Sequence, residues 1–233
     1  MNSCNKTILF ITCVSNEDLY QLCLKHIRKL KIPSSFNIEF LSLRNVNSMA
    51  SGYNQALQHK AKYKIYLHQD TFITEENFLI YLIDLFDKYK EVGLIGLAGC
   101  KKLPPTGVWW DGEGLVGKVI DCRFKEPYLL DFDKNVNKSI DDLEIVQAID
   151  GFLMATQYDV KWKEEWFDGF HFYDTSQSLE FEKNGYLIGV PFQQTAWSQH
   201  GENFTGNYQL DYMEYERNRK VFVNKYQKHI REK

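Results

Sequence analysis

Apolar runs alternate with amphipathic stretches over the first hundred residues. Short apolar runs at 7–14, 36–43, 63–67 and 92–98 are typical of buried strands. Between them, apolar positions recur with helical spacing at 17–31, 48–60 and 78–89. Repeated strand-helix-strand units predict a mostly parallel sheet with right-handed crossovers and helices flanking it, an α/β architecture that is typical of a nucleotide-binding half.

The pattern changes after Gly99. Residues 100–118 contain two prolines, several glycines and the pair Trp109-Trp110, so we expect a long irregular loop that closes over a bound ligand. Further strands are predicted at 128–132, 144–149, 152–156 and 186–190, with a short helix at 178–184. The last helix, at 208–229, has an apolar face that we expect to pack on the body. We expect one domain over 1–233, with a nucleotide-binding half (1–99), an acceptor and catalytic half (100–206) and a C-terminal helix (207–233).

The strand at 63–67 gives way abruptly to His68-Gln69-Asp70. Ligands of open α/β sheets bind outside the carboxyl ends of the strands, and a carboxylate there can hold a divalent cation or a ribose hydroxyl. Asp70 is therefore a candidate for such a role. The alternative is that Asp70 and Thr71 only begin a turn before a helix at Glu75.

Composition narrows the function classes. Lys and Arg number 28 against 31 Asp and Glu, a net charge of −3, which argues against a nucleic-acid partner. Aromatic residues make up 15 %, which suits a carbohydrate or nucleobase site but also simply fills a core. The five cysteines have neither metal nor disulfide spacing, so we expect reduced thiols. We recognise no signal peptide and no transmembrane segment, and expect a cytoplasmic protein, with peripheral association at the inner face of the membrane left open.

The order of four motifs resembles the GT-A glycosyltransferases, specifically a compact family-two-like group, over residues 8–200. The motifs are the exit from the first strand at 12–16, the helix at 51–56 leading to His68-Gln69-Asp70, the Asp150-Gly151-Phe152 strand, and the segment 167–186. No single motif is decisive, but their order and spacing together are fairly specific. The resemblance implies the GT-A fold for a nucleotide-diphospho-sugar transferase of the hexosyltransferase type, acting in polysaccharide biosynthesis.

The resemblance also implies a metal site. Family members have a DxD motif at this strand end, whose last carboxylate holds Mn²⁺ or Mg²⁺ on the donor diphosphate. Only the last position matches here, so the metal role falls to Asp70, while His68 would contact the ribose or phosphate of the donor. His200 stands where relatives often have a histidine at the metal or diphosphate, although a loop histidine is also an ordinary surface residue.

A general base is implied in the same way. Relatives carry an acidic pair eleven or twelve residues before a Gly-aromatic dipeptide, and Asp174 lies eleven residues before Gly185. Tyr173 stands where the family has a glutamate. The alternative is that Asp174 caps the helix ahead of Ser178. Asp168 and Glu180 are the next carboxylates to consider.

The remaining predicted site residues concern donor and acceptor. Thr12, Val14 and Ser15 at the first strand, Asn45 after the second, and Asn54 in the second helix are candidates for the donor site. UDP is the commonest family donor. Trp109 and Trp110 stand where the family has a mobile loop at the acceptor, and indole faces stack on sugar rings, but both residues are equally suited to a core.

The leading hypothesis is an inverting glycosyltransferase. It would move a sugar from a nucleotide-sugar donor to a hydroxyl of a glycan or lipid-linked glycan, with a divalent cation and Asp174 as base. A GT-A domain that binds nucleotide or glycan without turnover is the main alternative, because His68, Tyr173 and Asn45 depart from the family pattern. A nucleotidyltransferase is ranked last, since residues 14–18 lack the glycines of a phosphate loop.

Overall fold

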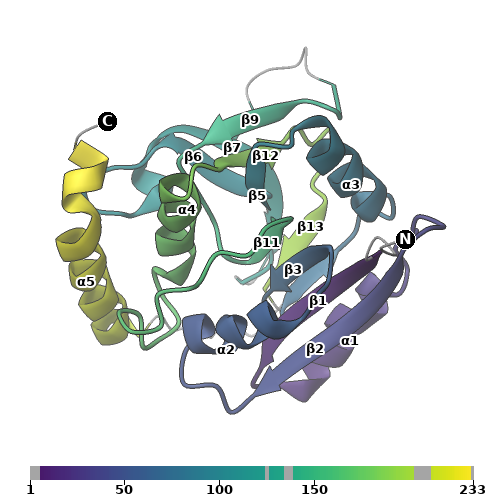
Figure 1. The fold of residues 1–233 in the computed structure, drawn as a ribbon, viewed down its shortest axis with the longest axis horizontal. Coiled ribbons are helices and arrows are strands. Elements are labelled where there is room, and N and C mark those ends of the chain that lie inside the picture. Colours follow the sequence, from purple (N-terminus) through teal and green to yellow (C-terminus); the bar gives the residue numbers. More distant parts are fainter. Residues whose placement is uncertain (1–5, 124–125, 134–138, 202–210, 232–233) are drawn as a thin grey trace.

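A computed structural model of the protein describes residues 6–123, 126–133, 139–201 and 211–231. In this part of the chain seven strands form one central sheet (Figure 1). In spatial order they are β2 (Asn37–Arg44), β1 (Thr7–Val14), β3 (Tyr63–Leu67), β11 (Leu153–Thr156), β5 (Val92–Gly96), β12 (Leu187–Pro191) and β9 (Leu143–Val146).

The central sheet is mostly parallel, as the sequence predicts. Strand β1 runs parallel to β2 and β3, and β12 runs parallel to β5. Strand β11 is antiparallel to both β3 and β5, so these two share one direction. Only β11 and β9 oppose the other strands among the described residues. The α/β fold class is therefore confirmed.

Helices bury both faces of this sheet. Along β1, Ile8 and Phe10 face the core formed with α1 (Glu17–Ile27) and α3 (Phe78–Lys88), whereas Leu9 and Ile11 face the core formed with α2 (Met49–Gln55). Strands buried on both faces have continuous apolar runs, which is why the sequence pattern located them well. Helix α1 begins where predicted, because the Asn16 side chain accepts a hydrogen bond from the Leu19 amide.

A second sheet carries part of the site and was largely missed. Its path in the described chain is β10 (Ala148–Ile149), β6 (Ala98–Lys102), β7 (Glu113–Asp121), β13 (Ser198–His200) and β4 (Thr71–Ile73), with β8 (Tyr128–Asp131) paired to β7. The prediction of one long loop at 100–118 is wrong, because β6 and β7 pair as antiparallel strands there. Gly117 has φ +99°, and a Cβ on it would lie 2.1 Å from the Leu97 carbonyl oxygen. Its glycine therefore serves close strand pairing rather than loop motion.

The last two helices of the described chain pack together, although two strands separate them along the sequence (Figure 1). Helix α4 (Tyr173–Lys183) begins five residues before the predicted start at Ser178, while α5 spans Tyr212–Arg231. The polar residues of the first turns of α4 are buried and hydrogen-bonded, which hid the helix from a hydrophobicity pattern: Ser176 contacts the Tyr226 hydroxyl, and Gln177 donates to the Val160 carbonyl. Of the predicted apolar face of α5, Phe222 and Tyr226 are fully buried, whereas Tyr212 is 65 % exposed and does not pack on the body as expected. Residues 208–210 of the predicted helix lie outside the described residues.

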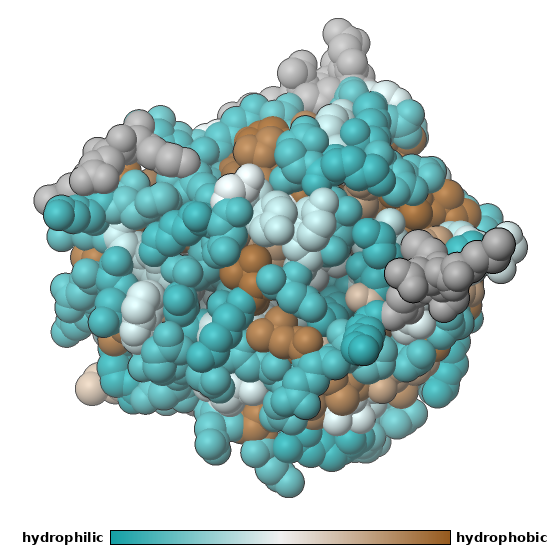
Figure 2. Space-filling view, in the orientation of Figure 1, coloured by the Kyte–Doolittle hydropathy of each residue, from teal (hydrophilic) through white to brown (hydrophobic). Residues whose placement is uncertain are grey.

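The face of the molecule seen in Figure 2 is mainly hydrophilic. Figure 2 shows scattered apolar residues on the face in view, separated by hydrophilic ones. Among the described helices there is none with both the length and the apolar character needed to cross a membrane.

Candidate functional site

Two cavities meet at the carboxyl end of β3. The first has a volume of about 570 Å³ and is lined by the ends of β1, β2 and β3. The second has a volume of about 550 Å³ and is lined by aromatic residues and several carboxylates. His68, Asp70 and Phe170 line both cavities, so the two form one cleft with His68 and Asp70 at the divide.

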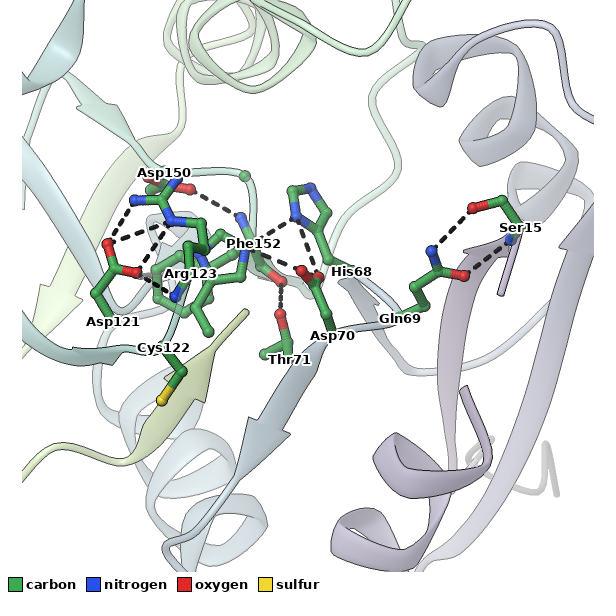
Figure 3. A network of polar contacts seen from close by, with 12 residues as sticks. Ser15, His68, Gln69, Asp70, Thr71, Asp121, Cys122, Arg123, Asp150 and Phe152 are labelled. Carbon is green, nitrogen blue, oxygen red and sulfur yellow. Dashed lines mark hydrogen bonds and ion pairs between the residues drawn. The ribbon is translucent and has the colours of Figure 1, made fainter. Parts of the chain in front are cut away.

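Gln69, the middle residue of His68-Gln69-Asp70, anchors the end of β3. The Gln69 side-chain oxygen accepts hydrogen bonds from the amides of Ser15 and Asn16, each at 2.8 Å, and its nitrogen donates to the Ser15 hydroxyl at 2.9 Å (Figure 3). These bonds join the exit of β3 to the exit of β1. The side chains of His68 and Asp70 are thereby left to face the cleft.

Three potential metal ligands lie close together at the boundary between the two cavities. His200 pairs across β13 with Thr71 of β4 and with Asp121 of β7, which brings its ring back to the end of β3. Its Nε2 lies 3.3 Å from His68 Nδ1 and 3.8 Å from Asp70 Oδ1, and His68 Nδ1 lies 4.0 Å from the same oxygen. All three ligand atoms fall within 4.8 Å of one another. Two imidazole nitrogens and a carboxylate oxygen at this spacing fit a divalent cation.

His68 also contacts Tyr173. Its Nε2 lies 2.5 Å from the Tyr173 hydroxyl, which in turn donates to the Gly151 carbonyl oxygen at 3.1 Å. Burial, followed by the neighbouring His200, lowers the pKa of His68 to about 4, so the ring is neutral at physiological pH. Burial also holds the pKa of Tyr173 well above its ordinary value. The two residues that depart from the family pattern are thus hydrogen-bonded to each other.

Asp174 lines the second cavity, as Asp70 does. Its two carboxylate oxygens accept hydrogen bonds from the amides of Gly151 (3.0 Å) and Thr175 (2.8 Å). Burial first, and then the nearby charge of Asp150, raise the pKa of Asp174 to about 7, against the lowering effect of those hydrogen bonds. Helix α4 begins at Tyr173, so Asp174 belongs to its first turn and does not cap a helix beginning at Ser178.

The backbone around Asp174 is unusual. Phe172, the residue before α4, is in the left-handed region with φ +60°, a conformation that costs a bulky residue about 1–3 kcal/mol. Its ring is held between Tyr215 and Phe222 of α5. A Cβ on Gly151 would lie 2.3 Å from the Tyr173 hydroxyl and 2.8 Å from Asp174 Cβ. Only glycine at 151 therefore lets α4 approach so closely.

Asp121 and Arg123 are functional candidates that the sequence patterns did not reveal. Asp121 is buried at the end of β7, and the Arg123 guanidinium binds it through both carboxylate oxygens, at 3.1 and 2.6 Å (Figure 3). Burial alone would raise the pKa of Asp121, but the hydrogen bonds and charge of Arg123 hold it below the ordinary value. Both side chains line the second cavity beside His200.

The predicted donor residues divide into two groups. Val14, Ser15 and Asn45 line the first cavity, and Asn45 adopts φ +56°, a conformation that asparagine tolerates well. Thr12 and Asn54 line neither cavity. Thr12 is buried within β1. Both ends of the Asn54 amide bond the backbone of Trp162, at 3.0 and 2.9 Å, so Asn54 holds the loop after β11 instead of a ligand.

The two tryptophans have different environments. Trp109 is 6 % exposed and packs edge-on against Phe132, whereas Trp110 is 50 % exposed and stacks on Tyr215 of α5. Both line the second cavity, Trp109 as part of its wall. They lie on a single 3₁₀ turn, Trp109–Asp111, between β6 and β7.

The alternative carboxylates lie elsewhere. Asp168 is 71 % exposed and pairs with Arg217 at 2.9 Å. Glu180 accepts a hydrogen bond from the Tyr226 hydroxyl at 2.9 Å and pairs with Lys163 and Lys183. Neither residue lines the two cavities.

Other site residues went unnoticed at the level of sequence. They are Gln69, Asp150, Asp121, Arg123 and Arg44, of which Arg44 lines the first cavity and pairs with Glu17. Gln69 and Asp150 lie inside the motifs His68-Gln69-Asp70 and Asp150-Gly151-Phe152, so the sequence could have marked them as site residues. Asp121 ends, and Arg123 follows, a strand that the glycine-rich pattern concealed.

Comparison with known proteins agrees with this architecture. Residues 9–226 match the family described as "Glycosyltransferase like family". TarS of S. aureus, crystallised as residues 1–349 with UDP-GlcNAc, superimposes with a TM-score of 0.52 at 13 % identity, over 97 % of this chain and 69 % of that one. The same piece without that ligand gives 0.50 at 12 % identity, over 84 % of this chain and 60 % of that one.

The match is to part of a larger protein. This chain spans 37 % of the length of the longer TarS structure, again with a TM-score of 0.50 and 12 % identity. At such identities the likeness shows the fold alone. No curated protein sequence matches the chain. The family match extends over nearly the whole sequence, and the chain therefore belongs to the glycosyltransferase-like family.

Proposed function

We propose that the protein is an inverting, metal-assisted glycosyltransferase that moves a sugar from a nucleotide-sugar donor to a hydroxyl of a glycan or lipid-linked glycan. One observation carries the proposal: the second cavity is lined at once by the ligand residues Asp70 and His200 and by the carboxylate of Asp174. A leaving diphosphate and an attacking hydroxyl need these two kinds of group on opposite sides of one sugar.

Asp174 acts as the general base. In a single displacement the acceptor oxygen bonds to the anomeric carbon while the bond from that carbon to the diphosphate breaks, and the hydroxyl proton passes to Asp174. A carboxylate with a pKa of about 7 accepts a proton more readily than an ordinary aspartate, and about half of it is still ionised at pH 7. Each of its oxygens accepts one amide hydrogen bond, which fixes the carboxylate and leaves lone pairs for the proton.

Asp70 and His200 hold the divalent cation, Mn²⁺ or Mg²⁺. When bound, the cation stabilises the negative charge that develops on the diphosphate as the sugar bond breaks. Backbone bonds fix both residues: the Gly201 amide donates to the Asp70 carbonyl oxygen at 2.9 Å, and the Cys122 amide donates to the His200 carbonyl oxygen at 2.8 Å. The cation ligands are thus positioned by strand pairing rather than by a free loop.

The first cavity takes the nucleotide. It lies at the carboxyl ends of β1, β2 and β3, the usual nucleotide position in such sheets. Its volume of about 570 Å³ suits a nucleoside with part of its diphosphate. TarS was crystallised with UDP-GlcNAc, which supports a UDP-sugar as the first donor to test.

The second cavity takes the acceptor. The exposed face of Trp110, stacked on Tyr215, offers an apolar surface to a sugar ring, and the carboxylates around it can accept hydrogen bonds from hydroxyls. Among the described residues that line this cavity, the carboxylates of Asp150, Asp174, Asp121 and Asp70 outnumber the guanidinium of Arg123. A neutral glycan end therefore suits the cavity better than an anionic one.

The experiment is a transfer assay with Asp174→Asn. A panel of nucleotide sugars is screened for Mn²⁺-dependent transfer to glycan acceptors, and the best donor is used with the variant. We expect kcat to fall by about 10²-fold or more because the base is lost, while the donor dissociation constant stays within about twofold. Asp168→Asn is the matched control, since Asp168 lies outside the cleft.

Two outcomes would count against the proposal. Near-normal transfer by Asp174→Asn would place the base elsewhere. Tight nucleotide binding by the unmodified protein without transfer from any donor would favour the domain that binds without turnover.

A further inference from the structure

We infer that His68 is a direct metal ligand and that His68, His200 and Asp70 form one site that prefers a transition-metal cation to Mg²⁺. The inference rests on the proposed function in one respect, that a cation binds at this end of the cleft. It goes further because the family pattern has a carboxylate at position 68. The consequence is a different choice of metal.

The geometry of the three ligand atoms is the first step. Metal bonds of about 2.1 Å place neighbouring ligand atoms roughly 3.0–3.5 Å apart in octahedral or tetrahedral sites. The three separations here are 3.3, 3.8 and 4.0 Å. Shifts of a few tenths of an ångström bring all three atoms onto one ion. Three ligands on one side leave the opposite positions open for diphosphate oxygens.

The second step is to locate the hydroxyl proton of Tyr173 and the ring proton of His68. Tyr173 has one hydroxyl proton, and it donates that proton to the Gly151 carbonyl oxygen. At His68 the tyrosine oxygen must therefore accept, so His68 Nε2 carries the ring proton. A neutral ring with its proton on Nε2 has a lone pair on Nδ1. This assignment, made from the hydrogen-bond pattern, aims the lone pair at His200 Nε2 and Asp70.

The same contact makes Tyr173 a supporting residue of the site. Histidine ligands usually donate their other ring N–H to an oxygen, which fixes both the tautomer and the orientation of the ring. The Tyr173 hydroxyl and the Gly151 carbonyl supply such a chain for His68. His200 is held differently, with its ring stacked on Phe152 at 5.0 Å and its backbone in β13. Both imidazoles are thus oriented before an ion arrives.

The donor set decides the metal. Magnesium prefers an oxygen environment and keeps several of its waters, whereas imidazole nitrogen suits the first-row transition metals. Two nitrogens with one oxygen therefore favour Co²⁺ and Zn²⁺ most, then Mn²⁺, and Mg²⁺ least. A carboxylate at 68 would reverse part of this preference. The histidine at 68, where the family has a carboxylate, thus changes the metal selectivity of the site. Tyr173, where the family has a glutamate, supports this histidine by accepting its hydrogen bond.

The test measures metal binding without donor or turnover. Co²⁺, Mn²⁺ and Mg²⁺ are titrated separately into the protein by calorimetry, and the visible absorption of bound Co²⁺ reports nitrogen ligation. We expect Co²⁺ to bind at least about 100-fold more tightly than Mg²⁺. His68→Asp should lower that ratio by about tenfold or more, and Tyr173→Phe should weaken Co²⁺ binding by roughly 10–100-fold with the imidazole still present.

Controls keep the result interpretable. His59→Asn removes a histidine that pairs with Glu39 away from the cleft, and it should leave all three affinities unchanged. Circular dichroism checks each fold, and His68→Gln replaces His68→Asp if the latter is unfolded. A ratio of Co²⁺ to Mg²⁺ affinity that is the same with and without the His68 imidazole would overturn the inference. So would Mg²⁺ binding as tightly as Co²⁺, or no cation binding at all.

The two proposals fail separately. His68-dependent Co²⁺ binding in a protein that transfers no sugar would overturn the proposed function alone. Transfer that depends on Asp174 but is indifferent to His68, with unchanged metal preference, would overturn the inference alone.

Discussion

The two cavities that meet at His68 and Asp70 are built in opposite ways. The first takes most of its walls from three neighbouring strand ends, at 13–15, 44–46 and 68–70, with Glu17, Met49 and Phe170 added. The second collects single side chains from β7, β13, α4, α5 and the turn at Trp109–Asp111, most of them aromatic or acidic. One is a local product of the parallel sheet, and the other depends on distant segments packing correctly.

This difference separates binding from chemistry. In the first cavity, backbone amides and the Gln69 side chain are fixed by hydrogen bonds between adjacent loops. In the second cavity, burial and the proximity of Asp150 raise the pKa of Asp174. The proposed cation ligands lie between the two cavities, where the proposed reaction would break the bond between nucleotide and sugar. Substitutions should therefore act differently on the two sides.

The largest expected effect concerns the second cavity. Trp109→Ala removes a buried ring and should lower the free energy of unfolding by about 3–5 kcal/mol. Trp110→Ala removes a half-exposed ring and should change it by only about 0.5 kcal/mol while raising the acceptor KM. Urea denaturation and acceptor kinetics give the two readouts. Equal losses of unfolding free energy in both variants would contradict the assignment of Trp109 to the buried cavity wall and of Trp110 to an exposed stacking surface.

The next effect lies at the boundary. Asp70→Asn keeps the shape of the side chain but removes the anionic ligand, so Mn²⁺-dependent binding of UDP should weaken at least about 10–100-fold, with the fold intact. Calorimetry with and without Mn²⁺ measures this. Asp84→Asn on the exposed face of α3 is the control and should bind normally. Unchanged metal-dependent affinity in Asp70→Asn would remove Asp70 from the metal site.

The smallest effect concerns the first cavity. Gln69→Ala breaks the three hydrogen bonds to Ser15 and Asn16, but these groups are exposed and water replaces the lost partners. We expect a cost of about 1 kcal/mol, seen as a several-fold rise in the UDP dissociation constant with kcat little changed. A collapse of kcat in this variant would mean that the two cavities are not separable.

The first half of the fold was predictable because its signals are local. Strands β1, β3 and β5 are buried on both faces and therefore give continuous apolar runs. The Asn16 cap and the polar exit at His68 mark the boundaries of elements directly in the sequence. Residues of the first cavity such as Ser15 and Asn45 follow from those boundaries. Thr12 and Asn54 line neither cavity, because position along a strand or helix does not say which neighbour a side chain meets.

The second half resisted prediction because its signals depend on tertiary contacts. Glycines at 107, 112, 114 and 117 suggested a loop, yet Gly117 serves a close approach between β6 and β7. The polar start of α4 suggested no helix, yet its hydroxyls and amides find partners in the interior. The contact between His68 and Tyr173 joins residues 105 positions apart. The sequence shows that His68 and Tyr173 each differ from the family pattern, but only the fold shows that the two residues are in contact.

The most direct test of the account is the pH dependence of kcat at saturating donor, acceptor and Mn²⁺. A base with its pKa raised to about 7 must lose its proton to act, so kcat should rise with pH through a midpoint near 7 and level off about one pH unit above it. Asp150→Asn removes the neighbouring charge, and the midpoint of that rise should move to lower pH. Asp168→Asn should leave it unchanged. A kcat that is flat from pH 5 to 9, or a midpoint that Asp150→Asn does not move, would contradict the assignment of Asp174 as the base.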